Sequence, residues 1–201
     1  MKYNLHDTYY KKAKQEGYRS RAAYKLIELD QRFRVFHPDD MVVDLGSAPG
    51  GWLQVAAKLV APEGKVVGVD LQCIEALSQR NAFFIQADIT ADQTAQRIEE
   101  RLGQLADCVI SDLSPKLSGI RDADDARCLE LNRTALRVVI RVLRPGGSLL
   151  VKSFVSEELR TFSAELEEFF RSVQRTRPEA SRRGSSEIYL FAKEFKPPLV
   201  S

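Results

Sequence analysis

The sequence is poor in the residues that build disulfide scaffolds and metal centres. It has three cysteines and two histidines in 201 residues. The cysteines (Cys73, Cys108 and Cys128) form no C-x-x-C pair, and the histidines (His6 and His37) lie far apart. An odd number of widely spaced cysteines favours reduced, buried thiols, and two scattered histidines do not form a ligand set. We therefore expect neither a structural disulfide nor a bound metal.

Long apolar runs are also missing. No stretch approaches the roughly 20 apolar residues that a membrane helix needs, and the first residues, MKYNLHDTYYKKAK, lack the apolar stretch of a secretory signal. This pattern predicts a cytoplasmic protein. A length of 201 residues, with 44% hydrophobic and 29% charged residues, is typical of a single globular domain over 1–201.

Charge is unevenly spread, although the net charge is only +2. Residues 1–36 hold nine basic and four acidic residues, and residues 171–184 hold five arginines and one glutamate. Residues 37–170 carry 14 basic and 21 acidic residues, and five of the six tyrosines lie within the first 24 residues. Basic residues interleaved with tyrosines suit contacts with phosphates and stacking on bases. The two flanks favour RNA as a partner, although a solvated amphipathic N-terminal segment stays open.

From residue 41 onward, short apolar runs alternate with helix-like stretches. Runs rich in β-branched residues, typical of strands buried on both faces, occupy 41–47, 65–71, 82–88, 106–113 and 147–154, and an alternating run occupies 187–195. Helical spacing is found over 90–105, with Thr90 as a candidate N-cap, and over 157–170. This alternation predicts an α/β fold with a doubly wound, mostly parallel sheet. Residues 1–36, with a helix over 20–33, form an appendage to the core of 37–201.

The turn after the first predicted strand is a candidate ligand site. Ligands of such sheets bind beyond the carboxyl ends of the strands, and this turn has the sequence GSAPGG over 46–51. It matches neither G-x-G-x-x-G nor the P-loop pattern, so it lacks the usual phosphate cradle. A glycine turn of this kind suits a ligand with a carboxylate and an amine.

Two carboxylates follow the next two predicted strands. Asp70 can accept the hydroxyls of a ribose, and Asp88 can reach the amino group of an adenine. Either residue alone is more often a strand-end cap. An amino-acid tail, a ribose and an adenine together describe S-adenosylmethionine, which we expect as the cofactor.

Five segments, in order and spacing, resemble the FtsJ/RrmJ family of RNA 2′-O-methyltransferases. They are RSRAAYKL, DLGSAPGGW, SDLSP, LRPGGSLLVKSF and RRGSSEIYLFA. The resemblance covers about residues 7–193. It implies a Rossmann-like methyltransferase fold with a seven-stranded sheet, and it points to a uridine of 23S ribosomal RNA in the large subunit as the substrate.

The resemblance also implies the site residues. The family's catalytic set falls on Lys25, Asp112, Lys152 and Glu187. Its cofactor contacts fall on Gly50, Trp52, Asp70, Asp88 and Asp112. One departure from the family is Lys116, where asparagine is expected in many relatives, and it leaves the exact substrate choice open.

The four residues of the catalytic set are unusual in their setting. Lys152 interrupts an apolar strand, where a lysine is costly unless it is paired or functional. We expect Lys152 to accept the ribose proton, Lys25 and Glu187 to orient the ribose, and Asp112 to hold Lys152 and favour the sulfonium. The alternative, in which Lys152 stays charged and only positions the oxygen, is left open, as are structural salt bridges.

Other functions are weaker. A non-catalytic RNA-binding or ribosome-assembly factor with this fold would not need a lysine inside a strand. Methylation of a transfer RNA stays open, and an aminopropyl transferase would leave the basic, tyrosine-rich N-terminus unexplained. The sequence does not decide between naked RNA and a ribosomal particle, and it does not give the oligomeric state.

Overall fold

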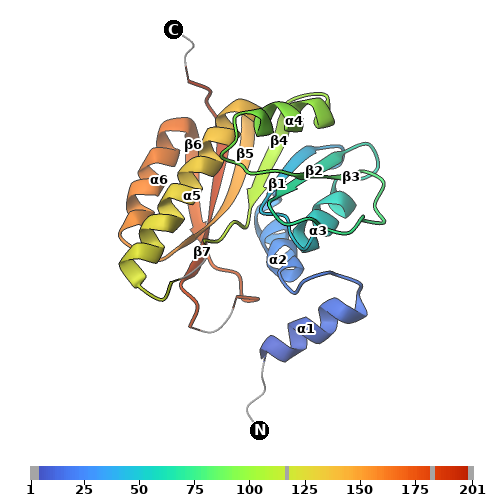
Figure 1. Ribbon diagram of the computed structural model, residues 1–201, viewed down its shortest axis with the longest axis horizontal. Coiled ribbons are helices and arrows are strands. Elements are labelled where there is room, and N and C mark those ends of the chain that lie inside the picture. Colours follow the sequence, from blue (N-terminus) through green and yellow to red (C-terminus); the bar gives the residue numbers. More distant parts are fainter. Residues whose placement is uncertain (1–4, 116–117, 182–183, 199–201) are drawn as a thin grey trace.

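The computed structural model describes residues 5–115, 118–181 and 184–198. Its centre is a seven-stranded sheet in the order β3-β2-β1-β4-β5-β7-β6 (Figure 1). The strands are β1 (Met41–Leu45), β2 (Lys65–Asp70), β3 (Ala82–Gln86), β4 (Ala106–Ser111), β5 (Leu143–Phe154), β6 (Phe170–Thr176) and β7 (Glu187–Phe195). Strands β1 to β5 pair in parallel, and β7 runs antiparallel to β5 and β6. The expected α/β fold with a mostly parallel, seven-stranded sheet is confirmed.

Helices cover both faces of the sheet (Figure 1). They are α1 (Leu5–Gln15), α2 (Ala23–Phe33), α3 (Gly51–Leu59), α4 (Gln93–Leu102), α5 (Arg121–Val142) and α6 (Glu158–Phe169). One buried cluster joins the sheet to α4, α5 and α6, and a second joins it to α2 and α3. Helix α2 therefore packs on the sheet, whereas α1 extends from the body of the molecule.

The central strands are apolar on both faces because each face meets a layer of helices. Neighbouring residues Val42 and Val43 both have an exposed fraction of 0%, although they belong to different clusters. On α4, the spacing of Ala95, Ile98 and Leu102 places three side chains in the first cluster. Burying an Ile or Leu side chain stabilises the fold by about 1.5–3 kcal/mol. This pattern fixes both the register of the strands and the inner face of the helix.

The strand order places a crevice at one edge of the sheet. The chain runs outward from β1 through β2 to β3 and then returns to β4 on the other side of β1. Connections therefore leave β1 and β4 in opposite directions, which opens a crevice at the carboxyl ends of these strands. The residues that follow Leu45, Asp70, Gln86 and Ser111 meet at this edge.

Two local features differ from the sequence pattern. The stretch 171–184 reads as an arginine-rich loop, but its first part belongs to the edge strand β6. Helix α4 begins at Gln93 with Asp92 at the N-cap, so the prediction of Thr90 as N-cap is wrong. Within the part of the chain that the structure describes, no helix is both long and apolar enough to cross a membrane.

Candidate active site

The turn after β1 packs closely against its neighbours. The backbone amides of Gly46 and Ser47 both donate to the carbonyl oxygen of Val69, at 2.9 and 3.2 Å. Gly50 has a φ of +107°, in the left-handed region that favours glycine. A Cβ atom at this position would lie 3.2 Å from Cδ of Arg19. Glycine therefore provides both the backbone conformation and the space for the arginine.

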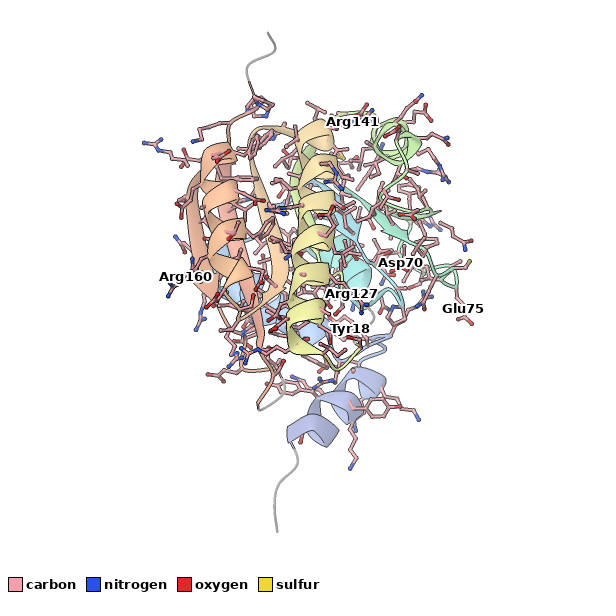
Figure 2. All side chains as sticks on the ribbon, turned by 60° about the vertical axis from the view of Figure 1, so that its left-hand side comes forward. Tyr18, Asp70, Glu75, Arg127, Arg141 and Arg160 are labelled. Atoms are coloured by element: carbon pink, nitrogen blue, oxygen red, sulfur yellow. The ribbon has the colours of Figure 1, made fainter. Side chains whose placement is uncertain are left out.

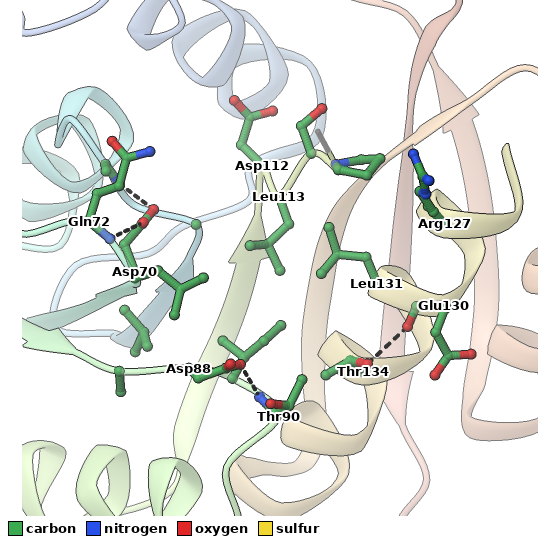
Figure 3. Close-up of a pocket in the computed structure, with 18 residues that line it drawn as sticks. Asp70, Gln72, Asp88, Thr90, Asp112, Leu113, Arg127, Glu130, Leu131 and Thr134 are labelled. Atoms are coloured by element: carbon green, nitrogen blue, oxygen red, sulfur yellow. Dashed lines mark hydrogen bonds between the residues drawn. The ribbon is translucent and has the colours of Figure 1, made fainter. Parts of the chain in front are cut away.

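A cavity of about 610 Å³ lies beyond the carboxyl ends of β2, β3 and β4 (Figure 3). Asp70, Asp88 and Asp112 line it, one from the end of each strand. Leu113 and Leu131 give it an apolar wall. A cavity with carboxylates and an apolar wall suits a ligand that carries hydroxyl and amino groups on an aromatic body.

Backbone amides fix the first two carboxylates. Asp70 accepts hydrogen bonds from the amides of Ala48 (3.0 Å) and Gln72 (2.8 Å), so it joins the glycine turn to the loop after β2. Asp88 accepts one from the amide of Thr90 at 2.8 Å. The hydrogen bonds from Thr90 hold the pKa of Asp88 below its ordinary value, so this carboxylate is charged at neutral pH. Each carboxylate oxygen can still accept from a ligand.

The four residues of the expected catalytic set come together next to this cavity. The Nζ atom of Lys152 donates to the backbone oxygen of Asp112 at 2.6 Å and lies 3.1 Å from its Oδ1. The Nζ atom of Lys25 lies 2.8 Å from Oε2 of Glu187. Both lysines are only 5% exposed. Two pairs, each of a buried lysine with a half-buried carboxylate, therefore lie at the same end of the sheet, from α2, the residue after β4, β5 and β7.

Tyr189 lies between the two pairs, and the sequence reading missed it. Its hydroxyl group donates to Oδ1 of Asp112 at 2.9 Å, and Nζ of Lys25 lies 5.9 Å from the centre of its ring. The register of β5 and β7 pairs Lys152 with Tyr189. A signal was available, because the alternation of the last strand puts residues 187 and 189 on the same face.

Comparison with known proteins identifies the chain. Residues 18–195 match the family described as FtsJ-like methyltransferase. The chain belongs to this family. It is 50% identical to ribosomal RNA large subunit methyltransferase E of Methanothrix thermoacetophila over 188 residues, which are 94% of this chain and 72% of that protein. It is 43% identical to the protein of the same name from Methanobrevibacter smithii, over 96% of this chain and 91% of that one.

Solved structures agree with the fold. A ribosomal RNA methyltransferase from Plasmodium falciparum superposes with a TM-score of 0.80 at 28% identity, covering 89% of this chain and 98% of that one. Fibrillarin from Aeropyrum pernix, solved with bound S-adenosyl-L-methionine, gives a TM-score of 0.54 at 16% identity, over 78% of this chain and 67% of that one. The second likeness concerns the fold alone. The family, the fold and the methyltransferase class predicted from the sequence are confirmed.

The cavity fits the methyl donor that this FtsJ-like family uses. S-adenosylmethionine has ribose hydroxyls, an adenine amino group and a charged sulfonium, and the cavity offers the acceptors Asp70, Asp88 and Asp112. Asp70 ends β2, and Asp88 and Asp112 follow β3 and β4, the next two strands along the chain. Which of them meets which part of the donor stays a prediction.

Two of the predicted cofactor contacts do not line the cavity. The indole of Trp52 is buried in the second cluster, and its Nε1 donates to the backbone oxygen of Ala22 at 2.9 Å. Gly50 contributes its backbone next to Arg19. The Trp52 side chain therefore packs in the core and holds Ala22, the N-cap residue of α2. Lys116, the departure from the family pattern, lies outside the described residues.

The charges around Glu187 and Tyr189 favour fixed protonation states. Burial by itself raises the pKa of Glu187, but the hydrogen bond and charge of Lys25, with the charge of Lys152, more than offset it, and the pKa lies below its ordinary value. Burial and the nearby carboxylates Asp112 and Glu187 raise the pKa of Tyr189 well above its ordinary value. At neutral pH Glu187 is therefore an acceptor and Tyr189 a donor.

A further carboxyl group, Asp44, lies beneath the site and was not singled out by the sequence. It is fully buried, and its two carboxyl oxygens have no hydrogen-bond partner among the described residues. Burial, together with the charges of Asp112 and Asp70, raises its pKa well above the ordinary value. Burial and the two neighbouring carboxylates therefore favour the protonated form of Asp44. The described residues contain no group of three His, Cys, Asp or Glu side chains arranged to hold a metal.

Proposed function

We propose that this chain transfers the methyl group of S-adenosylmethionine to the 2′-oxygen of a ribose in large-subunit ribosomal RNA, at a uridine of the 23S type. The observation that carries the proposal is the pair of buried lysine–carboxylate contacts, Lys152 with Asp112 and Lys25 with Glu187, beside the donor cavity. The names of the relatives support ribosomal RNA of the large subunit as the substrate.

Methyl transfer to a hydroxyl group needs two things from the protein. S-adenosylmethionine, when bound, supplies an electrophilic methyl group on a positively charged sulfur. The chain must hold the ribose oxygen in line with that group and remove its proton. Residues Asp70 and Asp88 hold the donor in this proposal, and Asp112 favours its positive charge.

Lys152 is placed to take the proton. Its Nζ atom lies close to two oxygen atoms of Asp112, at 2.6 and 3.1 Å. A neutral amine has two N–H groups and one lone pair, so two donated hydrogen bonds leave the lone pair for the ribose hydroxyl. A charged amine would offer a third N–H group there and would only position the oxygen. Both arrangements satisfy the two contacts with Asp112, and substitution of Lys152 by arginine distinguishes them.

Lys25 and Glu187 orient the ribose. Their 2.8 Å contact holds a donor and an acceptor side by side, with Nζ of Lys25 at 5.9 Å from the centre of the Tyr189 ring. A ribose has adjacent hydroxyl groups, which can accept from Lys25 and donate to Glu187. The buried Tyr189 ring keeps both pairs at a fixed spacing.

The two basic segments of the sequence meet in space near these residues. The carboxylate of Glu28 on α2 accepts hydrogen bonds from the amides of Glu179 and Ala180, at 2.9 and 3.2 Å. Tyr24 packs with Ala180 in a small cluster that also includes Ala13 of α1. The N-terminal segment and the loop after β6 therefore form one face, which in this proposal binds RNA phosphates.

We propose a single domain over residues 1–201 that acts in the cytoplasm, with the basic segment of 1–36 gripping RNA and the core of 37–201 carrying the chemistry. A non-catalytic assembly factor is disfavoured, because such a protein would not need the buried pairs. Transfer RNA is disfavoured by the names of the relatives.

The test is to incubate the purified chain with labelled S-adenosylmethionine and large ribosomal subunits, free large-subunit RNA or transfer RNA that lack the modification. A 2′-O-methyl group blocks alkaline cleavage of the adjacent phosphodiester, so label should appear in an alkali-resistant dinucleotide of the large-subunit RNA. Label in alkali-sensitive mononucleotides would indicate base methylation instead. Label in transfer RNA alone would contradict the substrate.

A further inference from the structure

Arg19 forms an unusual bridge between the N-terminal segment and the donor cavity. It lies between α1 and α2, and its guanidinium group donates to three backbone carbonyl groups. Nη1 lies 2.7 Å from the oxygen of Glu75 and 3.4 Å from that of Pro49, and Nη2 lies 2.7 Å from that of Ala76. No sequence pattern pointed to this role, because Arg19 reads as one basic residue among nine.

The three carbonyl groups belong to the two loops that frame the donor cavity. Pro49 is part of the glycine turn after β1, and Glu75 and Ala76 lie in the irregular loop between β2 and β3. Figure 2 shows Glu75 of this loop at the outer rim of the molecule. Asp70 joins the same two loops from the cavity side, through the amides of Ala48 and Gln72. Asp70 therefore joins the two loops on the side that faces the cavity, and Arg19 joins the same loops on the opposite side.

Arg19 is itself fixed in place. Its backbone amide donates to Oε1 of Gln54 at 2.9 Å, and Nε2 of Gln54 donates to the oxygen of Gly17 at 3.0 Å. Its side chain lies against Gly50, where a Cβ atom would come within 3.2 Å of it. Gln54 belongs to α3, the helix that follows the glycine turn. Both the backbone and the side chain of Arg19 are therefore held in place.

We propose that Arg19 is a positioning residue for the methyl donor, which holds the loops 46–51 and 71–79 at the spacing that the donor needs. The inference rests on the proposed use of S-adenosylmethionine in this cavity. The planar guanidinium group can direct separate N–H groups to both loops at once, whereas an ammonium group is a single point donor. A loop held in its ligand-binding conformation loses less entropy when the ligand binds.

The competing reading is that Arg19 contacts RNA phosphate, as its place in a basic segment suggests. The two readings differ in which affinity changes. An RNA contact affects only the binding of RNA, whereas a loop bridge affects the binding of the donor product in the absence of any RNA.

The experiment measures S-adenosylhomocysteine binding to the full chain by isothermal titration calorimetry, without RNA, for the wild type, Arg19→Ala, Arg19→Lys and Lys14→Ala. Lys14 is an exposed lysine of α1 and serves as a matched loss of positive charge. We expect the dissociation constant to rise about tenfold or more in Arg19→Ala and to recover only in part in Arg19→Lys, because the lost pre-organisation lowers affinity. We expect Lys14→Ala to stay within about twofold of the wild type.

Hydrogen exchange by mass spectrometry gives a second readout. Removal of the bridge should speed exchange in the peptides covering 46–51 and 71–79, with strands β1 and β4 unchanged as evidence of a folded core. Unchanged S-adenosylhomocysteine affinity in Arg19→Ala would overturn the inference, and weaker RNA binding in the same variant would favour the RNA contact. A wild-type chain that binds no S-adenosylhomocysteine would instead refute the proposed function.

Discussion

At the scale of single residues, the site depends on charges that are buried in pairs. Lys25 and Lys152 are each 5% exposed, and each has a carboxylate partner within about 3 Å. A buried charge without its partner is strongly destabilising, whereas a well-paired one is tolerated. Experiments on these residues must therefore distinguish a loss of catalytic activity from a loss of folding.

Lys152→Arg separates the two roles of this lysine. An arginine keeps the positive charge and the contact with Asp112 but does not accept a proton at neutral pH. We expect the turnover number to fall by about 10²-fold or more, the usual contribution of a positioned base, while S-adenosylhomocysteine binding changes little. Single-turnover methylation of RNA measures the first quantity and calorimetry the second. A turnover number close to that of the wild type would rule out the base role.

Asp44 gives a prediction about pH and stability. Its pKa is raised in the folded state, so the folded chain keeps a proton that the unfolded chain loses above pH of about 4. The stability that this proton provides is full below the unfolded pKa and is lost as the pH rises toward the folded pKa. Each unit of elevation corresponds to about 1.4 kcal/mol in the free energy of unfolding.

Asp44→Asn removes this titration and keeps the shape of the side chain. We expect the variant and the wild type to have similar unfolding free energies near pH 4, and the variant to become the more stable one as the pH rises to 8. Urea unfolding at both pH values measures the difference. A difference between the two proteins that is independent of pH would show that Asp44 is charged in the fold.

At the scale of elements, the sequence predicted the strands with two buried faces and missed the one with exposed residues. The apolar runs over 41–47 and 65–71 became β1 and β2, because burial on both sides leaves no other arrangement for such residues. Strand β6 has only Phe170 and Thr176 buried, and its other positions include arginines. Side chains on an edge strand face the solvent, where polar residues are favoured. The sequence of this strand therefore resembles that of a loop.

The same limit applies to the site. Lys25, Asp112, Lys152 and Glu187 were reached through motifs, and the fold then brings them together. Tyr189 and Arg19 act through contacts between segments that are 77 and up to 57 residues apart. The alternation of the last strand places Tyr189 on the face of Glu187, but no local pattern reports the partners of either residue, because these contacts form only when the strands have taken their order.

A prediction at this scale concerns the joint between α2 and the loop after β6. The carboxylate of Glu28 accepts both amide hydrogen bonds that hold residues 179 and 180 against the helix. In Glu28→Ala the loop loses this anchor, so we expect RNA affinity to fall several-fold while S-adenosylhomocysteine binding is kept. Glu168→Ala, an exposed glutamate on α6, is the matched control. If Glu28→Ala and the control bind RNA equally well, the joint does not contribute to the RNA face.

At the scale of the whole molecule, the binding regions for the methyl donor and for RNA differ in charge. The donor cavity is lined by aspartates from the acidic middle of the chain, whereas basic residues gather in the N-terminal segment and around the loop after β6. The joint at Glu28 brings these basic segments together beside the Lys25–Glu187 pair. An RNA strand held there would present its ribose to the edge of the sheet where the donor cavity opens.

This separation predicts different responses to salt. RNA that is held by about five phosphate contacts on a single strand should show a slope of about −3.5 when the logarithm of its association constant is plotted against that of the salt concentration, because each contact releases counterions. S-adenosylhomocysteine has no net charge at pH 7 and enters a cavity, so its affinity should change by less than about twofold between 50 and 300 mM salt. Fluorescence anisotropy with a labelled RNA stem-loop and calorimetry with S-adenosylhomocysteine measure the two slopes. Equal slopes would contradict the separation, because the basic face would then also govern the donor cavity.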